Sequence, residues 1–236
     1  MQINHIVRSN KRITTNKTRV ISRNQQMMRL DAEITKDLDD HDTMNLLDRV
    51  KLFIAREKPD VIIFEDYNKG VLTEKIIHEV TALCKKAGVI TAVDPKRKNF
   101  FNYKGVDIFK PNLKEVKEGL NLLIEDVNKG VLQNIHKELA AVLKHDISFI
   151  TLSEKGVFYE QGKQAAIIAS HIRNISDVSG AGDTVIAVAS LVYASTKNAH
   201  LMAEVANIAG GLVCEEVGTV AINKEKLLHE CEVLLA

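Results

Sequence analysis

The sequence predicts an α/β fold with a mostly parallel sheet and helices on both of its faces. Short runs of consecutive apolar residues, typical of strands buried on both faces, alternate with helical patterns of about ten to fifteen residues. Hydrophobic residues make up 45% of the 236 residues, enough for a sizeable core without disulfides. No apolar stretch approaches the length of a membrane-spanning helix, so no membrane partner is expected.

The first part of the chain is predicted to form a two-stranded ribbon from the segments 17–22 and 26–31. Both segments are too polar for a core sheet, so we expect the ribbon to cover another part of the molecule. The first 30 residues contain seven Lys and Arg residues and no acid, although the net charge of the whole chain is +1. This block indicates a solvated arm, a cover over a small phosphorylated ligand, or a nucleic-acid arm, the last disfavoured by the lack of aromatic residues.

From residue 42 onward the pattern of helices and strands becomes regular. The first helix ends at Pro59, and Thr73 and Gly88 mark the two ends of the second. The remaining helices are expected at 128–144, 182–196, 198–215 and 223–235. The strands are expected at 61–64, 89–93, 107–109 and 148–152, with an antiparallel pair at 156–160 and 165–170.

Polar residues cluster where the predicted strands end. Glu65, Asp94, Asn112 and Ser153 each lie at such a position. Ligands of open α/β sheets bind at the carboxyl ends of the strands. The strand order therefore points to one shared site.

The motif richest in chemistry is Asp177-Val178-Ser179-Gly180-Ala181-Gly182-Asp183, directly before a strongly helical segment. The glycines expose backbone N–H groups, which form an anion hole at a helix N-terminus. Asp183 lies beside this hole, where a carboxylate suits removal of a proton from an attacking hydroxyl during phosphoryl transfer. By itself, Gly-Ala-Gly-Asp is equally consistent with an ordinary helix start that carries an Asp cap.

Several segments, in the same order along the chain, resemble the ribokinase-like (PfkB) carbohydrate kinases. Asp-x-x-Gly-Ala-Gly-Asp resembles the family signature, and Asn112-Leu113-Lys114-Glu115 resembles its Asn-x-x-Glu element. Residues 151–156 resemble its nucleotide-binding strand and turn, with Ser153 in place of the first glycine. The segments at Asn207 and Gly218 resemble those on the adenosine side. The resemblance implies a ribokinase-like three-layer α/β/α fold with a small β lid.

Other segments resemble one branch of that family, the kinases of ADP-heptose synthesis. These are residues 12–31, which resemble the lid, together with 66–70 and 93–96. That branch phosphorylates the anomeric hydroxyl of D-glycero-β-D-manno-heptose 7-phosphate to the 1,7-bisphosphate, for ADP-heptose and lipopolysaccharide core synthesis. Because this substrate already carries a phosphate, it fits a cationic ribbon. The family's stretch before the lid, with its first strands and a Gly-rich sugar-binding element, has no counterpart in this sequence.

The resemblance implies a role for each residue that matches a motif, with ATP as donor and Mg²⁺ and possible K⁺ as ions. Asp183 is the expected catalytic base, and the amides of Gly180, Ala181 and Gly182 form the anion hole. The other expected contacts are Lys96, Ser153, Gly156, Asn207 and Gly218 for the nucleotide, Asn112 and Glu115 for Mg²⁺ and phosphate, Asp177 for a monovalent cation, and Arg19 and Arg23 for the sugar phosphate.

We expect residues 1–40 to form the lid ribbon and the segment leading into the core, and 41–236 an N-terminally incomplete α/β kinase core. We also expect a cytoplasmic homodimer without a nucleic-acid partner, and no zinc site, because the eight histidines lack ligand spacing. A kinase of another sugar and a truncated, non-catalytic remnant that binds nucleotide or a partner remain as alternatives. Without the first strands the sheet would expose an unpaired edge and an apolar face. We therefore expect the chain to be either an oligomer that covers this surface or a weakly stable, catalytically poor fragment.

Overall fold

The computed structural model describes residues 5–23, 25–171 and 173–235. In this part of the chain the central sheet has six strands, in the order β3-β4-β5-β6-β7-β8. The first four strands pair in parallel and the last two extend the sheet antiparallel. Their bounds are β3 Val61–Glu65, β4 Ile90–Asp94, β5 Ile108–Phe109, β6 Ile147–Thr151, β7 Val157–Gln161 and β8 Gln164–Ile168. The prediction of an α/β fold with a mostly parallel sheet is confirmed.

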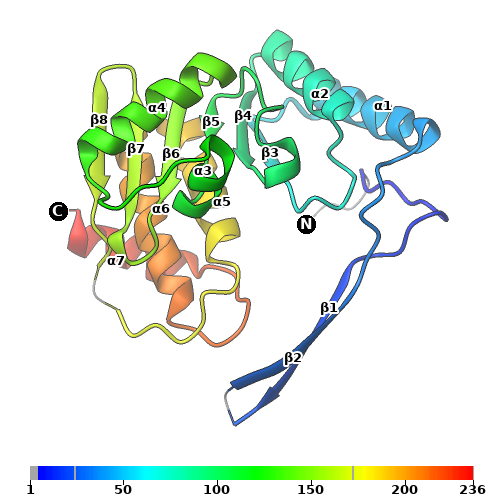
Figure 1. Ribbon diagram of the computed structural model, residues 1–236. Coiled ribbons are helices and arrows are strands. Elements are labelled where there is room, and N and C mark those ends of the chain that lie inside the picture. Colours follow the sequence, from blue (N-terminus) through cyan, green and yellow to red (C-terminus); the bar gives the residue numbers. More distant parts are fainter. Residues whose placement is uncertain (1–4, 24, 172, 236) are drawn as a thin grey trace.

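Helices cover both faces of this sheet (Figure 1). One face carries α1 (Asp40–Glu57), α2 (Glu74–Ala87), α3 (Leu113–Leu120) and α4 (Lys129–Leu143). The other carries α5 (Ala181–Thr196), α6 (Ala199–Cys214) and α7 (Lys224–Leu234). Adjacent strand residues such as Ile108 and Phe109 enter opposite hydrophobic clusters, because side chains alternate across a strand. The three-layer α/β/α architecture is therefore confirmed, and none of the described helices is long and apolar enough to cross a membrane.

Local capping explains where the elements begin and end. Thr73 accepts a hydrogen bond from the Ile76 amide at the start of α2, and Gly88 ends that helix with a left-handed φ of 71°, as predicted. The first helix begins at Asp40, earlier than predicted, because the Asp39 side chain caps it. Helix α3 was not predicted, since its eight residues are too few to show a clear apolar period.

The ribbon consists of β1 (Asn16–Ser22) and β2 (Gln25–Ala32), which pair antiparallel in a sheet of their own. It projects away from the layered body (Figure 1), and β1 is exposed along its whole length. Arg19 lies opposite Arg29, and the next pair along the strands is Val20 with Met28. Because side chains alternate along a strand, the ribbon has two unlike faces. We name them the cationic face (Lys17, Arg19 and Arg29, with one acid, Asp31, that pairs with Arg29) and the apolar face (Val20, Met28 and Leu30, with Thr18).

Candidate active site

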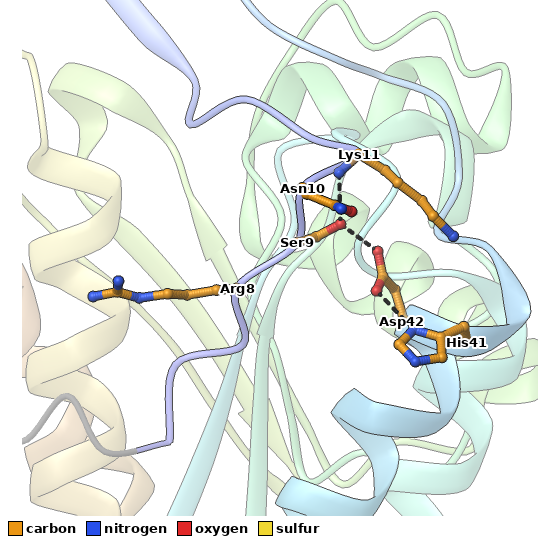
Figure 2. Close-up of a pocket in the computed structure, with 6 residues that line it drawn as sticks. All are labelled: Arg8, Ser9, Asn10, Lys11, His41 and Asp42. Atoms are coloured by element: carbon orange, nitrogen blue, oxygen red, sulfur yellow. Dashed lines mark hydrogen bonds and ion pairs between the residues drawn. The ribbon is translucent and has the colours of Figure 1, made fainter.

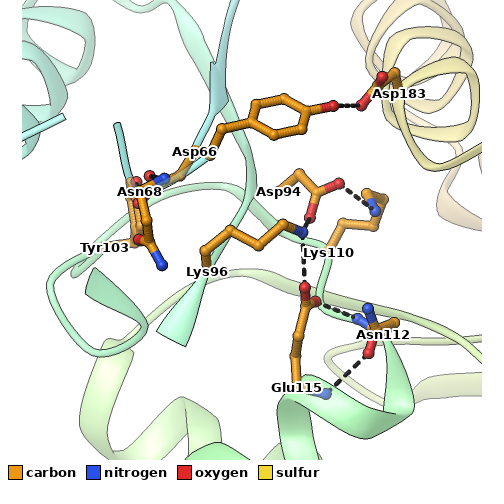
Figure 3. A network of polar contacts seen from close by, with 10 residues as sticks. Asp66, Asn68, Asp94, Lys96, Tyr103, Lys110, Asn112, Glu115 and Asp183 are labelled. Carbon is orange, nitrogen blue, oxygen red and sulfur yellow. Dashed lines mark hydrogen bonds and ion pairs between the residues drawn. The ribbon is translucent and has the colours of Figure 1, made fainter. Parts of the chain in front are cut away.

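Acidic side chains meet at the carboxyl edge of the parallel strands. Glu65 at the end of β3 is in register with Asp94 at the end of β4. The first turn of α5 brings Asp183 to the same edge, where it lies across from Asp94 (Figure 3). One carboxylate oxygen from each of these three residues lies within 4.8 Å of the other two. The edge indicated by the sequence as the ligand site therefore carries three carboxylates in close proximity.

Two lysines lie within this acidic group. Lys110, only 2% exposed, places Nζ 3.0 Å from Asp94 Oδ2. Lys96 Nζ lies 3.0 Å from Asp94 Oδ1 and 2.7 Å from Glu115 Oε1. Burial disfavours the charged form of Lys96, but Asp94 and Glu115 outweigh it and raise the pKa of Lys96. A Cβ atom on Gly182 would lie 3.6 Å from Asp94 Oδ2 and 3.9 Å from Lys110 Nζ, so the N-terminus of α5 lies directly beside this buried ion pair.

Glycine is required at the point where α5 begins. Gly180 has a φ of +82°, and a Cβ atom there would lie 2.9 Å from Thr219 Cγ2. The Ala181 amide donates a hydrogen bond to the carbonyl of Val178 at 3.3 Å. Of the three predicted anion-hole amides, that of Ala181 is thus partly used by the loop itself. The N–H groups of a first helical turn have no intrahelical acceptor and are available to an anion.

Asp177 braces the glycine loop. Its Oδ1 accepts a hydrogen bond from the Ser179 amide at 2.9 Å, and its Oδ2 accepts one from the Gly218 amide at 3.2 Å. These bonds, with a further contribution from the charge of Arg19, lower the pKa of Asp177. The carboxylate therefore joins the loop before α5 to the segment that follows α6.

Two of the predicted nucleotide residues, Gly156 and Asn207, lie beside residues 168–170, whereas Lys96 lies at Asp94 and Gly218 lies at Asp177. Gly156 has a φ of +91°, and a Cβ atom there would lie 2.0 Å from the Ile168 carbonyl oxygen. Asn207 Nδ2 donates a hydrogen bond to the Ala169 carbonyl at 2.8 Å. Ser153, where the family has glycine, adopts a left-handed φ of 56° at an exposed turn. The backbone at this position thus keeps a conformation that favours glycine.

Asn112 and Glu115, expected to help hold Mg²⁺, also start α3 as a capping box. Asn112 Oδ1 accepts a hydrogen bond from the Glu115 amide at 2.8 Å, and Glu115 Oε2 accepts one from the Asn112 amide at 2.9 Å. The second oxygen of Glu115 faces Lys96 (Figure 3). The pair therefore has a structural role and also borders the lysine and carboxylate network.

Four residues at this site had no predicted role: Glu65, Tyr67, Asp94 and Lys110. Tyr67 Oη donates a hydrogen bond to Asp183 Oδ1 at 2.6 Å. Each of the four lies at or just after the end of a strand, which was the available signal. That signal does not say which strand-end side chains turn toward α5.

Glu65 has an unusual environment for a carboxyl group. Burial, followed by the negative charges of Asp94 and Asp183, raises the pKa of Glu65 to about 7. Although the residue as a whole is exposed, its carboxyl group faces the other acids of the site. The charge of the site therefore changes near neutral pH.

The two ribbon arginines predicted to contact substrate lie in different places. Arg19 is on the cationic face, close enough to Asp177 for its charge to act on that carboxylate. Nearer the base of the ribbon, Lys17 Nζ lies 5.1 Å from the centroid of the Tyr67 ring. Arg23 occupies the turn at the ribbon's tip, away from the layered body (Figure 1). The cationic face is thus turned toward the site, and Arg19 is nearer to it than Arg23.

A second polar cluster joins the N-terminal segment to the start of α1 (Figure 2). Ser9 Oγ donates a hydrogen bond to Asp42 Oδ2 at 2.6 Å, and Lys11 Nζ lies 2.5 Å from Asp39 Oδ2. Arg8 points away from this cluster in Figure 2. Its acids are already paired within the chain, so we read it as a structural contact.

A three-layer α/β/α fold with a glycine loop, a helix N-terminus and a carboxylate at one strand edge defines a phosphotransferase-type site of the ribokinase class. Residues 2–226 match the model of the pfkB family of carbohydrate kinases. The chain therefore belongs to the pfkB carbohydrate kinase family.

Relatives and solved structures agree with this membership. The chain is 36% identical over 228 residues to a bifunctional protein HldE of Methylobacillus flagellatus, covering 97% of this chain and 46% of the relative. The chain is 34% identical over 219 residues to the bifunctional protein HldE of Desulfatibacillum aliphaticivorans, and this match covers 92% of this chain and 44% of the relative. The chain thus spans less than half the length of these relatives.

Two solved structures share the fold at low sequence identity. Phosphofructokinase-2 from Escherichia coli in complex with potassium superposes with a TM-score of 0.75 at 14% identity, covering 89% of this chain and 67% of that one. Arabidopsis thaliana ribokinase complexed with ribose and ATP superposes with a TM-score of 0.68 at 16% identity, covering 86% of this chain and 64% of the ribokinase chain. These similarities support the ribokinase-like fold.

Proposed function

We propose that this chain is an ATP-dependent kinase of the anomeric hydroxyl of D-glycero-β-D-manno-heptose 7-phosphate, producing the 1,7-bisphosphate. The observation that carries the proposal is the position of Asp183, in the first turn of α5 beside the buried pair of Lys110 and Asp94. Family membership supports transfer of a phosphoryl group to a sugar hydroxyl. Similarity to HldE proteins, with the resemblance of residues 12–31 and 66–70, supports a heptose substrate.

In the proposed reaction, Asp183 takes the proton of the anomeric hydroxyl as that oxygen attacks the γ-phosphorus of ATP. The bond from this phosphorus to the bridging oxygen breaks, and ADP leaves with the bonding electrons. Because Tyr67 holds Oδ1 of Asp183, Oδ2 accepts the proton. The N–H groups at the start of α5, together with Lys96 and Lys110, stabilise the charge on the transferring group.

The donor set of the site fits Mg²⁺, which prefers carboxylate oxygens and water. Glu115 is engaged by Lys96 and by the Asn112 amide, so this pair would hold the ion through water. The carboxylate of Asp94 lies nearby and adds a further oxygen donor. When bound, the ion neutralises part of the charge of the ATP phosphates.

We further propose that Asp177 is near a monovalent cation such as K⁺. Its oxygens each accept one amide hydrogen bond, which leaves lone pairs for a cation. A cation there would stabilise the glycine loop that Asp177 already braces.

We propose that this chain forms a homodimer, so that its macromolecular partner is another copy of the same chain. The cationic face of the ribbon is turned to the site, so the apolar face points away from it. Val20, Met28 and Leu30 on that face are 42%, 49% and 54% exposed. An isolated two-stranded ribbon is marginal in water, and a second ribbon would cover this face.

The direct test is release of ADP from ATP with a panel of sugars: heptose 7-phosphate, unphosphorylated heptose, fructose 6-phosphate and ribose. We expect the highest kcat/KM with heptose 7-phosphate, and in Asp183→Ala we expect turnover of that sugar to fall by at least about a hundredfold. Preference for another sugar would correct the substrate. A chain that binds ATP but phosphorylates no member of the panel would support the non-catalytic alternative.

A further inference from the structure

The turn that follows β3, residues 66–70, is anchored firmly in the core. Asp66 is 3% exposed, and its carboxylate accepts hydrogen bonds from Tyr103 Oη at 2.7 Å and Asn99 Nδ2 at 2.9 Å (Figure 3 shows Asp66 beside Tyr103). The same carboxylate accepts a hydrogen bond from the Asn68 amide at 2.8 Å. The backbone that carries Tyr67 is therefore held from both sides.

Both chain segments that lead to the ribbon contact this turn. Lys69 Nζ lies 2.5 Å from Oε1 of Glu33, the residue just after β2. Arg12, which precedes β1, donates a hydrogen bond to the Lys69 carbonyl. The Gly70 carbonyl accepts a hydrogen bond from the Leu38 amide at 2.9 Å. The turn therefore holds both ends of the ribbon in place on the layered body.

Tyr67 connects the ribbon to the active-site carboxylate. Its ring lies under Lys17, and its hydroxyl donates to Asp183 Oδ1 at 2.6 Å. Burial and the charge of Asp183 raise the pKa of Tyr67 above its ordinary value, so the hydroxyl keeps its proton and remains a donor. A single side chain therefore contacts both the ribbon and the reacting end of the site.

We propose that Tyr67 is a positioning residue that couples the position of the ribbon to the orientation of the Asp183 carboxylate. This inference rests on the proposed role of Asp183 as the base. Arg19 lies two residues beyond Lys17 on the same face of β1. A substrate phosphate bound at Arg19 fixes the strand that holds Lys17 over the ring, and the ring fixes Asp183. The substrate's existing phosphate thereby orients the carboxylate that acts on its distant hydroxyl.

The hydroxyl is tested by Tyr67→Phe, which keeps the ring. We expect kcat to fall about ten- to a hundredfold, the effect of losing a charge-assisted hydrogen bond, with KM for ATP unchanged. The matched control is Tyr159→Phe, which removes a hydroxyl that contacts His200 at 3.1 Å. We expect the kcat of Tyr159→Phe to stay within about twofold of that of the unmodified chain. An unchanged kcat in Tyr67→Phe would overturn the positioning role.

The coupling is tested by a double-mutant cycle between Lys17 and Tyr67. We expect Lys17→Met to raise KM for heptose 7-phosphate in the unmodified chain and in Tyr67→Phe, because the ring is present in both. In Tyr67→Leu, Lys17→Met should have no further effect. Lys163→Met, in the β7–β8 turn, is the control for removal of a surface charge. Additive effects in every background would refute the coupling.

A readout that does not depend on kinase activity is trypsin cleavage of the ribbon. Tyr67→Leu should speed cleavage at the ribbon's arginines severalfold, whereas Tyr67→Phe should leave it unchanged; equal melting temperatures would show that both variants are folded. If the unmodified chain phosphorylates no sugar, the proposed function fails while this experiment still tests the contact. Unchanged cleavage in Tyr67→Leu would refute the coupling even in an active enzyme.

Discussion

Lys110 and Asp94 form an ion pair of 3.0 Å at the carboxyl ends of neighbouring strands, and both side chains are buried. Asp94 is also paired with Lys96, so one carboxylate holds two ammonium groups in place. The pair joins β4 to the residue after β5 directly beside the first turn of α5. Its geometry therefore stabilises the sheet edge, and in the proposed function it holds Lys110 beside the helix N-terminus expected to bind phosphate.

Lys110→Met should destabilise the protein. Removal of one partner leaves Asp94 as a buried charge, and we expect the free energy of unfolding to fall by about 3 kcal/mol, the low end for such a change because Lys96 remains. Urea denaturation measures this. Lys114→Met, which removes an ammonium with 85% side-chain exposure, should change stability by less than about 0.5 kcal/mol. Equal losses of stability in the two variants would contradict a stabilising role for the buried ion pair of Lys110 and Asp94.

Glu65→Gln should change how stability depends on pH. The carboxyl group of Glu65 has a pKa of about 7 in the folded chain and an ordinary value of 4.5. Between these values the folded state holds a proton that the unfolded state has released, so stability falls as pH rises through this window and stays lowered above it. The Tm difference, variant minus unmodified chain, should therefore increase between about pH 5 and about pH 8. A constant difference would rule out the raised pKa.

Asp183→Ala should lower turnover by at least about a hundredfold, the low end for loss of a general base. ATP binding, measured by calorimetry, should remain largely intact, because the proposed nucleotide contacts lie elsewhere. The matched control is Asp126→Ala, which removes an exposed acid before α4. Its turnover should be close to that of the unmodified chain. Near-normal turnover of Asp183→Ala would remove this residue from the base role.

Arg19→Ala should raise KM for heptose 7-phosphate by about ten- to a hundredfold, through loss of a charge-assisted hydrogen bond to phosphate. KM for the unphosphorylated heptose should change far less. Arg23→Ala should have a smaller effect, because Arg23 lies at the tip of the ribbon. Steady-state kinetics with both sugars decides, and equal changes for the two sugars would refute phosphate recognition by Arg19.

Placing charges on the apolar face of the ribbon should dissociate the proposed dimer. We expect Met28→Glu with Leu30→Glu to sediment as a monomer where the unmodified chain sediments as a dimer, because two desolvated carboxylates oppose association. Leu123→Glu, at a fully exposed position before α4, should leave the dimer intact. A monodisperse, fully active monomer of the unmodified chain would contradict this proposal.

Much of the architecture could be predicted because it depends on short-range patterns. The apolar runs of β4 and β6 and the caps Thr73 and Gly88 each reflect residues close in sequence. Helix α3 was missed, since an eight-residue helix held by a capping box resembles a loop in sequence. The resemblance to the family supplied Lys96, Asn112 and Glu115, but not the contact between Lys96 and Glu115 in the folded chain, and not Lys110.

The sequence by itself determined the order of the elements and the glycine loop before Asp183, because apolar period, caps and glycine conformations act over a few neighbouring residues. Only the tertiary structure decided that Tyr67 contacts Asp183, 116 positions away, and that Lys17 lies over the Tyr67 ring. The parallel pairing of β3 with β4 and the packing of α5 on both strands select which strand-end side chains meet. Such convergence depends on how distant elements pack, and local sequence patterns do not encode it.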